Sequence, residues 1–478
     1  MRTYLILIIF IKSSLLYDKV CLYLTKKGIY TMKKISLSGA TLVASLLGIV
    51  GVENAYAIPS FARQTGLDCT VCHTVYPELT HFGRDFKMRG YVMEGGTTAM
   101  PLPLAAMIMA DTTSVSKSKD SDGNSVATNG NGDNRNGELV IPQVSIFYGG
   151  KIYDKIGAFI QMTYDGTLLP QDKAVAPYIS MDNADIRYAN STMLYNKELV
   201  YGVSINNNPT VQDLWNSTPA WGFPYTSSAI APKPAASTLI DGGLGHVVAG
   251  VSAYVMFNDM IYAELGVYHT IPAGGIESLL GWHNGGSNPA VSGNAPYGRV
   301  ALQHDFGSHY IMVGSYAMAT KIKQIGTDKL DSYNDFAIDT EYQYDNDKHN
   351  VTATASKIWE KAKLDASNDP AVATADNASN SLTTNKIKAS YRYDHKYGAA
   401  LGYASTSGNA DATRYGTTLA PDSSYGIAEL DYLPITQVKF SLQYTMYDKF
   451  NGAKTNYDGN GRNAADNNTV YLVGWFMF

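Results

Sequence analysis

Cysteine is scarce in this chain of 478 residues, which contains only Cys21, Cys69 and Cys72. Cys21 precedes a predicted export signal, so the expected mature protein keeps two cysteines three positions apart, and no structural disulfide is predicted. A basic excess is also lacking, since 37 Lys and Arg stand against 42 Asp and Glu. The net charge of −5 therefore gives no indication of nucleic-acid binding.

Long apolar runs are missing from the chain beyond residue 57. No stretch there reaches the roughly 18 apolar residues that a membrane-spanning helix needs. In contrast, tyrosine is abundant, with 35 residues against 14 phenylalanines, and there are 43 glycines. Together with low overall hydropathy, this composition favours a β-barrel over a helical membrane protein.

Residues 1–57 have the pattern of an upstream extension followed by a secretory signal. A Met-Lys-Lys start at Met32 leads into an apolar run over residues 37–52, and an Ala-x-Ala cleavage site ends at Ala57. We therefore expect the true start at Met32 and cleavage after Ala57. Residues 1–31 contain a second apolar run, so a genuine N-terminal anchor is the alternative.

A Cys-x-x-Cys-His motif occupies residues 69–73 and is typical of c-type haem attachment. The thiols of Cys69 and Cys72 add to the two vinyl groups of the porphyrin, and His73 becomes the proximal axial ligand of the iron. A redox dithiol or half of a zinc site are the alternatives. Because histidine follows directly and no later cysteine completes a zinc set, the motif predicts one covalent haem c.

The second axial ligand must reach the other face of the haem. Methionine ligation raises the potential of haem iron, and the nearby candidates are Met93, which we prefer, then Met88 and Met100. His81 ranks behind them, because we expect it to share a short helical segment with His73. An open sixth position is a further alternative.

Apolar and polar residues alternate with a period of two from residue 103 onward. Val438, Phe440 and Leu442 alternate with Lys439 and Ser441, for example. A soluble β-sandwich also alternates, but here seven short turns alternate with eight long loops rich in Gly, Asn, Ser and Asp. This rhythm predicts an all-β fold, an antiparallel outer-membrane barrel of about 16 strands with short periplasmic turns and long external loops.

Three regions follow from these patterns. Residues 1–57 are the extension and signal peptide, residues 58–102 the monohaem cytochrome c segment, and residues 103–478 the porin-like barrel. A domain of about 40 residues rarely folds alone, so we expect the haem segment to plug or cap the lumen of the barrel. The last strand ends in Phe478, which resembles the assembly signal of Gram-negative outer-membrane proteins.

Charged residues are few, at 17% of the chain. Some are predicted on the lumen face, where they could contact a plug but are mostly expected to be solvated or paired: Asp182, Asp185, Arg187, Asp339, Glu341, Lys388 and Arg392. The external loops carry scattered aspartates without metal-ligand spacing, so no dedicated iron-docking site is expected. The nearly uncharged loop 206–243, taken as external, hints at an acidic habitat.

A longer resemblance surrounds the haem motif. It comprises Ala57-Ile58-Pro59-Ser60-Phe61-Ala62-Arg63-Gln64-Thr65-Gly66, Cys72-His73, Pro77-Glu78-Leu79, Phe82-Gly83-Arg84, Phe86-Lys87 and Gly90-Tyr91. This stretch resembles the fused monohaem cytochrome–porins of iron-oxidising bacteria, the outer-membrane iron:cytochrome c oxidoreductases. Over the barrel the resemblance is architectural only.

The resemblance implies an oxidoreductase that takes electrons from extracellular Fe(II) in the Gram-negative outer membrane. It also implies a periplasmic cytochrome c or cupredoxin as the acceptor. Cys69, Cys72 and His73 carry over as the haem site, whereas the distal ligand does not. Two alternatives remain, namely a porin with an accessory cytochrome domain and a conduit that delivers electrons outward to external acceptors.

Overall fold

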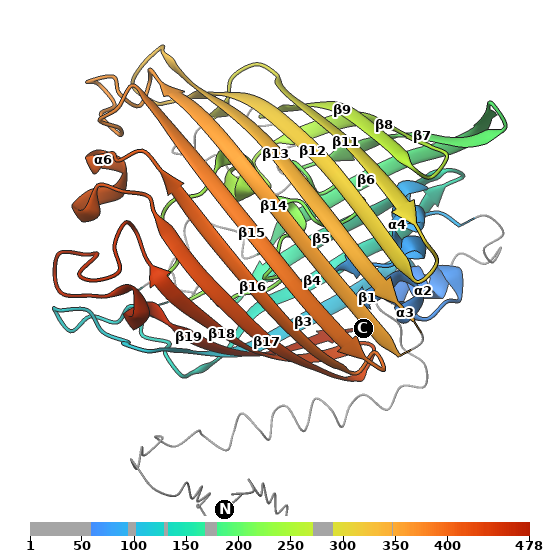
Figure 1. Ribbon diagram of the computed structural model, residues 1–478, viewed down its shortest axis with the longest axis horizontal. Coiled ribbons are helices and arrows are strands. Elements are labelled where there is room, and N and C mark those ends of the chain that lie inside the picture. The colour runs from blue at the N-terminus through green and yellow to red at the C-terminus, as the bar shows by residue number, and fades with distance from the viewer. Residues whose placement is uncertain (1–58, 94–101, 129–131, 168–178, 271–289, 347) are drawn as a thin grey trace, which may run out of the picture. The chain divides into compact units, whose positions relative to one another are not determined.

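The computed structural model describes residues 59–93, 102–128, 132–167, 179–270, 290–346 and 348–478 (Figure 1). The predicted signal peptide, its cleavage site and Met100 lie outside these residues. Within them, no helix has the length and apolar character needed to cross a membrane.

Sixteen antiparallel strands of the described chain form one closed ring (Figure 1). They are β3 (Leu104–Val115), β4 (Leu139–Tyr153), β5 (Ile156–Asp165), β6 (Ile179–Leu194), β7 (Lys197–Asn206), β8 (Ala249–Phe257), β9 (Ile261–His269), β11 (Ala295–Asp305), β12 (His309–Lys323), β13 (Leu330–Asp345), β14 (His349–Leu364), β15 (Ser379–Tyr393), β16 (Tyr397–Gly408), β17 (Ser423–Ile435), β18 (Val438–Lys449) and β19 (Thr469–Met477). The ring closes where β19 pairs with β3, and β9 pairs with β11. The short β10 (Ala290–Val291) also pairs with β12. The predicted sixteen-stranded antiparallel barrel is confirmed.

The outer surface of the barrel is apolar, as the alternation predicted. Leu265, Leu302 and Leu401 point outward and are 76%, 61% and 68% exposed. Exposed leucines are unfavourable in water but suit contact with lipid. Closure also removes the unpaired strand edges that a bilayer does not tolerate. This is the architecture of outer-membrane proteins.

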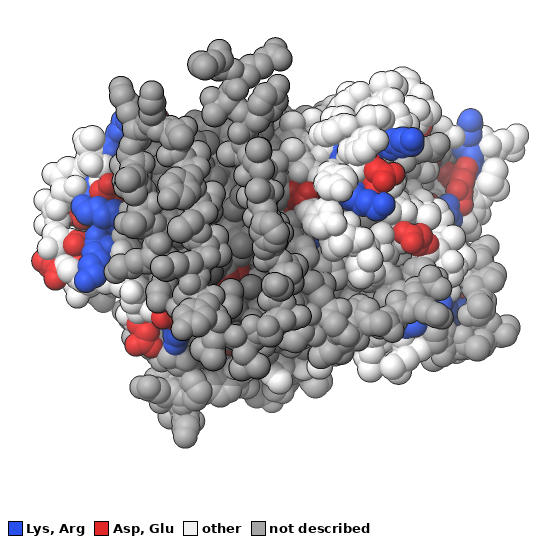
Figure 2. Space-filling view, turned by 90° about the horizontal axis from the view of Figure 1, so that it is seen from below, with Lys and Arg blue, Asp and Glu red and all other residues white. Residues whose placement is uncertain are grey.

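Charges of both signs are mixed on the surface. On the described part of the face in Figure 2, Lys and Arg lie beside Asp and Glu instead of forming a patch of one sign.

Residues 59–93, here called the N-terminal segment, fold into short elements joined to the barrel wall. They are α2 (Pro59–Thr65), α3 (Cys69–Cys72), β1 (His73–Val75), β2 (Glu78–Leu79) and α4 (His81–Met88). Thr80 caps α4 by accepting a hydrogen bond from Gly83 N at 3.2 Å. Gly90, with φ +73°, follows the end of this helix in a conformation that suits glycine.

Several strands around the ring hold the N-terminal segment. Arg84 donates to Gln343 on β13 at 2.7 Å, and Tyr91 donates to Asp185 on β6 at 2.6 Å. Gln64, on α2, accepts from a backbone N–H of β4 at 2.8 Å. These contacts come from lumen-facing positions, so the segment is attached to the inner side of the wall at several points.

The connection between β7 and β8, residues 207–248, also folds inward, and we call it the inward loop. It contains η2 (Pro219–Trp221) and η3 (Leu239–Gly243). Trp215 is 1% exposed, and its indole N–H donates to Gln303 on β11 at 3.0 Å. The expectation that residues 206–243 form an external loop is therefore wrong. Burial inside the barrel accounts for the few charges that this stretch carries.

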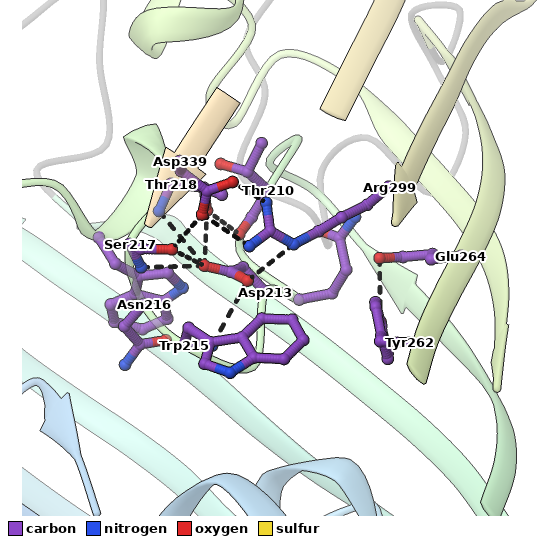
Figure 3. Close-up of polar contacts among 12 residues, drawn as sticks. Thr210, Asp213, Trp215, Asn216, Ser217, Thr218, Tyr262, Glu264, Arg299 and Asp339 are labelled. Carbon is purple, nitrogen blue, oxygen red and sulfur yellow. Dashed lines mark hydrogen bonds and ion pairs between the residues drawn. The ribbon is translucent and has the colours of Figure 1, made fainter. Parts of the chain in front are cut away.

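A buried charge cluster anchors the inward loop (Figure 3). Asp213 accepts from the backbone N–H of Ser217 at 2.9 Å and lies 3.2 Å from the guanidinium of Arg299 on β11. Arg299 also makes a bidentate pair with Asp339 on β13, at 3.0 and 2.8 Å. All three charged side chains are fully buried. The loop is thus tied to two strands through charges that depend on one another.

The other predicted lumen charges are paired as well. Arg187 and Asp185 are both fully buried and 2.8 Å apart. Arg392 lies 2.9 Å from Asp431. Four of the predicted charges contact the N-terminal segment, as the sequence suggested: Asp185, Arg187, Glu341 and Lys388.

We predict that Arg299→Met releases the inward loop. Removing one partner of a buried ion pair costs about 3–5 kcal/mol, because the remaining charges stay buried without a counter-charge. Limited proteolysis within residues 207–248 and conductance in planar bilayers should both rise.

The matched control is Arg135→Met. Arg135 lies 2.9 Å from Glu138, but this pair is partly exposed and in a loop, where an ion pair contributes about 0–1 kcal/mol. Equal proteolysis and equal conductance in Arg299→Met and Arg135→Met would contradict the anchoring role of the cluster.

Candidate cofactor site

The Cys-x-x-Cys-His motif forms one helical turn followed by a hairpin. Asp68 caps α3 by accepting from Thr70 N at 3.1 Å, and β1 begins at His73. The Nδ1 of His73 lies 3.1 Å from the carbonyl oxygen of Glu78. This hydrogen bond fixes the ring and leaves Nε2 as the nitrogen available to a metal.

The pKa values of His73 and Cys72 suit a metal-binding histidine beside a haem-linked cysteine better than a redox-active dithiol. Burial lowers the pKa of His73 to about 4, so the ring is neutral at ordinary pH, as metal binding requires. Burial, with a smaller effect of Cys69, raises the pKa of Cys72 to about 12. Redox-active dithiols need the opposite shift, towards the thiolate.

Cys69, Cys72 and His73 all line one cavity of about 450 Å³. Most of its wall is apolar or aromatic, with rings from the N-terminal segment, the inward loop and strands β4, β5 and β19: Phe61, Tyr76, Phe86, Tyr91, Phe147, Phe159, Trp221, Tyr225 and Trp475. A cavity of this kind suits a flat, largely apolar cofactor that carries a few polar groups.

Two buried donors in the cavity wall have no partner among the described residues. They are the hydroxyl of Tyr76 and the indole N–H of Trp475. The ammonium of Lys439 lies 5.6 Å from the centre of the Tyr76 ring and 5.0 Å from the centre of the Trp475 ring. An unsatisfied buried donor costs about 1–3 kcal/mol. Both atoms are covered by surrounding side chains, so the fit to haem c is carried by Cys69, Cys72 and His73 beside this largely apolar cavity.

Helix α4 packs directly on the backbone of the motif. The N–H of Thr80 donates to the carbonyl oxygen of Cys72 at 3.0 Å. A Cβ at Gly83 would lie 2.2 Å from that same oxygen. Only glycine allows this approach, so Gly83 sets the distance between α4 and the two cysteines.

Glu78 connects the motif with two other parts of the chain. Its carboxylate accepts from Lys388 on β15, from Tyr225 of the inward loop at 3.1 Å, and from Thr74 at 2.9 Å. Burial raises the pKa of Glu78, but Lys388 and Arg392 outweigh burial and hold that pKa at about 2. A single ionised side chain thus joins the segment, the wall and the inward loop.

The predicted distal ligands lie in different places. Met88 is 3% exposed and packs with Trp215 and Tyr254 in another buried cluster. Met93 lines a separate cavity of about 280 Å³. His81 begins α4, whereas His73 begins β1, so the expectation of a shared helical segment is wrong. His81 instead lies 2.8 Å from Asp259 and is half exposed.

Sequence reasoning missed three methionines of the barrel wall. Met107, Met109 and Met477 line the same cavity as His73. A signal for the first two was present, because residues two apart on a strand share a face. Met477 reaches the cavity because the last strand pairs with the first. The spacing of residues along one strand does not reveal such pairing.

Comparisons with known proteins show similarity in the barrel fold. No family model matches the chain, and no curated protein does. OprB of Pseudomonas putida is 8% identical, with 78% of this chain and 94% of that chain covered and a TM-score of 0.47. The anion-selective porin of Comamonas acidovorans is 14% identical, covering 78% and 98%, with a TM-score of 0.42. The channel DcaP of Acinetobacter baumannii is 11% identical, covering 78% and 96%, with a TM-score of 0.43.

We predict that acid weakens the attachment of the N-terminal segment through Glu78. The pKa of Glu78 in the folded protein lies below its ordinary value of 4.5. The stability that ionised Glu78 gives the folded protein is therefore present above pH 4.5 and is lost as pH falls towards 2. The difference corresponds to about 3 kcal/mol. Glu78→Gln should remove this pH dependence and expose residues 59–93 to hydrogen exchange at every pH, after correction for intrinsic rates.

Glu198→Gln is the control for that experiment. Glu198 also binds the segment, 3.0 Å from Arg89, but the pair is partly exposed. Because exposed ion pairs contribute little stability, Glu198→Gln should leave hydrogen exchange in residues 59–93 almost unchanged. Equal protection in Glu78→Gln and wild type across the acid range would rule out the role given to Glu78.

We also predict that Gly83→Ala lowers the amount of covalently attached haem per chain. The added methyl group would force α4 away from Cys72 and disturb the wall of the cavity. The pyridine haemochrome spectrum measures the attached haem. Gly426→Ala is the control, since its Cβ would meet no atom closer than 3.8 Å. Full loading of Gly83→Ala would show that the close approach is dispensable.

Proposed function

We propose that this protein is an outer-membrane cytochrome that oxidises extracellular Fe(II) and passes the electron to a periplasmic carrier. The observation that carries the proposal is the convergence of Cys69, Cys72 and His73 on one cavity, which residues of the barrel wall also line. A covalently attached haem c would supply a one-electron carrier at this position.

Each residue of the motif has a definite task in this proposal. Cys69 and Cys72 hold the cofactor by thioether bonds, and His73 binds its iron through Nε2. The carbonyl oxygen of Glu78 orients the His73 ring. The surrounding aromatic rings exclude water, and water exclusion limits the reorganisation that accompanies a change of charge.

The N-terminal segment and the inward loop support a plugged lumen. Lys87 of α4 donates to the carbonyl oxygens of Val211 and Asp213, at 2.9 and 2.6 Å, and to Asn216 at 2.9 Å. The two segments are therefore bonded to each other as well as to the wall. A diffusion porin needs an open path for solutes, so the alternative of a porin with an accessory cytochrome domain predicts solute conductance past this contact.

A second cavity, here called the vestibule, supports an approach by the donor from outside. It measures about 300 Å³, and its wall includes Thr406, Ser423 and Thr469, which lie where strands meet the long loops. Long loops are external in outer-membrane barrels and short turns are periplasmic. Gly222 and Pro224 line both cavities. The inward loop thus places residues in the lining of both the vestibule and the haem cavity.

Ferrous iron as the donor rests on the resemblance around the haem motif and on the arrangement of the two cavities. Each Fe(II) gives up one electron and becomes Fe(III). A periplasmic cytochrome c or cupredoxin accepts that electron at the short-turn end.

Anaerobic stopped-flow mixing of the oxidised, haem-loaded protein with Fe(II), followed by haem absorbance, tests this proposal. We expect rapid reduction and a high midpoint potential. Cys72→Ala and His73→Ala should lose haem-linked activity while the barrel still assembles, as heat-modifiable migration on gels would show.

Two other results would contradict the proposed function. No reduction together with a low potential would exclude Fe(II) as the donor and favour a conduit that delivers electrons outward. A purified wild-type chain without covalent haem, but with steady solute conductance, would overturn the cytochrome and favour the porin.

A further inference from the structure

The cavity that holds His73 also contains a patch of thioethers from the barrel wall. Met107, Met109 and Met477 line it and are 2%, 3% and 7% exposed. All three belong to the buried cluster that includes Cys69. From this we infer that one of these methionines, at the seam where β3 pairs with β19, is the second axial ligand of the haem iron. The inference rests on the proposed function.

Strand pairing places the three side chains next to one another. Met107 pairs with Met477 across the seam, and Met109 pairs with Trp475. Met107 and Met109 are two residues apart on β3 and so share the lumen face. The three thioethers therefore form one compact patch that the two strands hold in place.

Most other donors in the cavity already have partners; the hydroxyl of Tyr76 has none among the described residues, but it is a hard oxygen donor that suits this role less than a thioether. The ammonium of Lys87 donates to three acceptors, and the hydroxyl of Tyr91 donates to Asp185 at 2.6 Å. Gln143 and Gln161 each donate to Ser145 at 3.1 Å. A thioether has no such partner to lose on binding a metal, because it is only a weak hydrogen-bond acceptor.

The remaining lining donors are no better suited to the iron. Among the described lining residues, His73 is the one histidine. Asp182 lies 3.1 Å from His246, and Tyr225 donates to Glu78 at 3.1 Å. A soft, neutral thioether in a dry wall is thus the donor that the cavity offers to a soft metal centre.

The N-terminal segment offers methionines in less suitable places. Met88 is surrounded by Trp215, Tyr254 and Tyr262 in another cluster. Met93 packs against the cluster that includes Cys69, but the cavity that it lines is a separate one, which it shares with Phe82 and Arg89. A ligand from the wall would bond the iron to two separate parts of the chain, with His73 on the segment and a methionine on the barrel.

The test uses the haem-loaded full-length protein and five single variants. Met107→Leu, Met109→Leu and Met477→Leu change the wall patch, whereas Met88→Leu and Met93→Leu are matched controls. Exchanging methionine for leucine nearly conserves volume, so assembly should survive. The readouts are the charge-transfer absorption band of methionine-ligated ferric haem and the midpoint potential.

We expect one wall variant to lose the band and to show a lower midpoint potential, while both control variants keep the band. Loss of the band in Met88→Leu or Met93→Leu, retention in all five variants, or absence from the wild type would overturn the inference. If a leucine variant fails to assemble, the corresponding glutamine variant replaces it.

Failure of the proposed function has a different signature. A chain without covalent haem gives no haemochrome spectrum, so the cytochrome itself would be rejected. A fully loaded chain that Fe(II) does not reduce would reject the donor, and the identity of the axial ligand could still be read from the same spectra.

Discussion

Ion pairs buried inside the barrel hold the separate parts of this structure together. Glu78 binds Lys388 and Tyr225, which brings the N-terminal segment, the wall and the inward loop to one point. Arg299 on β11 binds Asp213 of the inward loop and Asp339 on β13, and so joins the loop to two strands. Because isolated charges are costly at such depth, each of these partners limits where the others can lie. The cavity around His73 is shaped by these constraints as much as by its own aromatic lining.

Strand number and strand faces were predictable from the sequence because both depend on local patterns. The alternation around Phe440 and Lys439 follows from the geometry of a strand, and turn residues mark where each strand ends. The inward loop was not predictable in this way. Asp213 and Trp215 look like ordinary loop residues until Arg299 and Gln303, from a distant strand, come within hydrogen-bonding distance.

The candidate site also has a part that was predictable from local sequence and a part that was not. Cys69, Cys72 and His73 are recognisable because five consecutive residues carry the whole chemical requirement. Their surroundings are not recognisable, since Met107 and Trp475 lie far from the motif in sequence and reach it only after the ring closes. Patterns of neighbouring residues therefore reveal what attaches the cofactor, whereas tertiary contacts decide what tunes it.

Gly222 and Pro224 line both cavities, so a short stretch of the inward loop adjoins the two spaces. An electron can tunnel across one thickness of polypeptide, but a hydrated metal ion or a proton in bulk water cannot pass through it. In the proposed function, ferric products would thus form and precipitate on the vestibule side of that stretch. The cell would then gain electrons from dissolved Fe(II) while the ferric product stays outside the envelope.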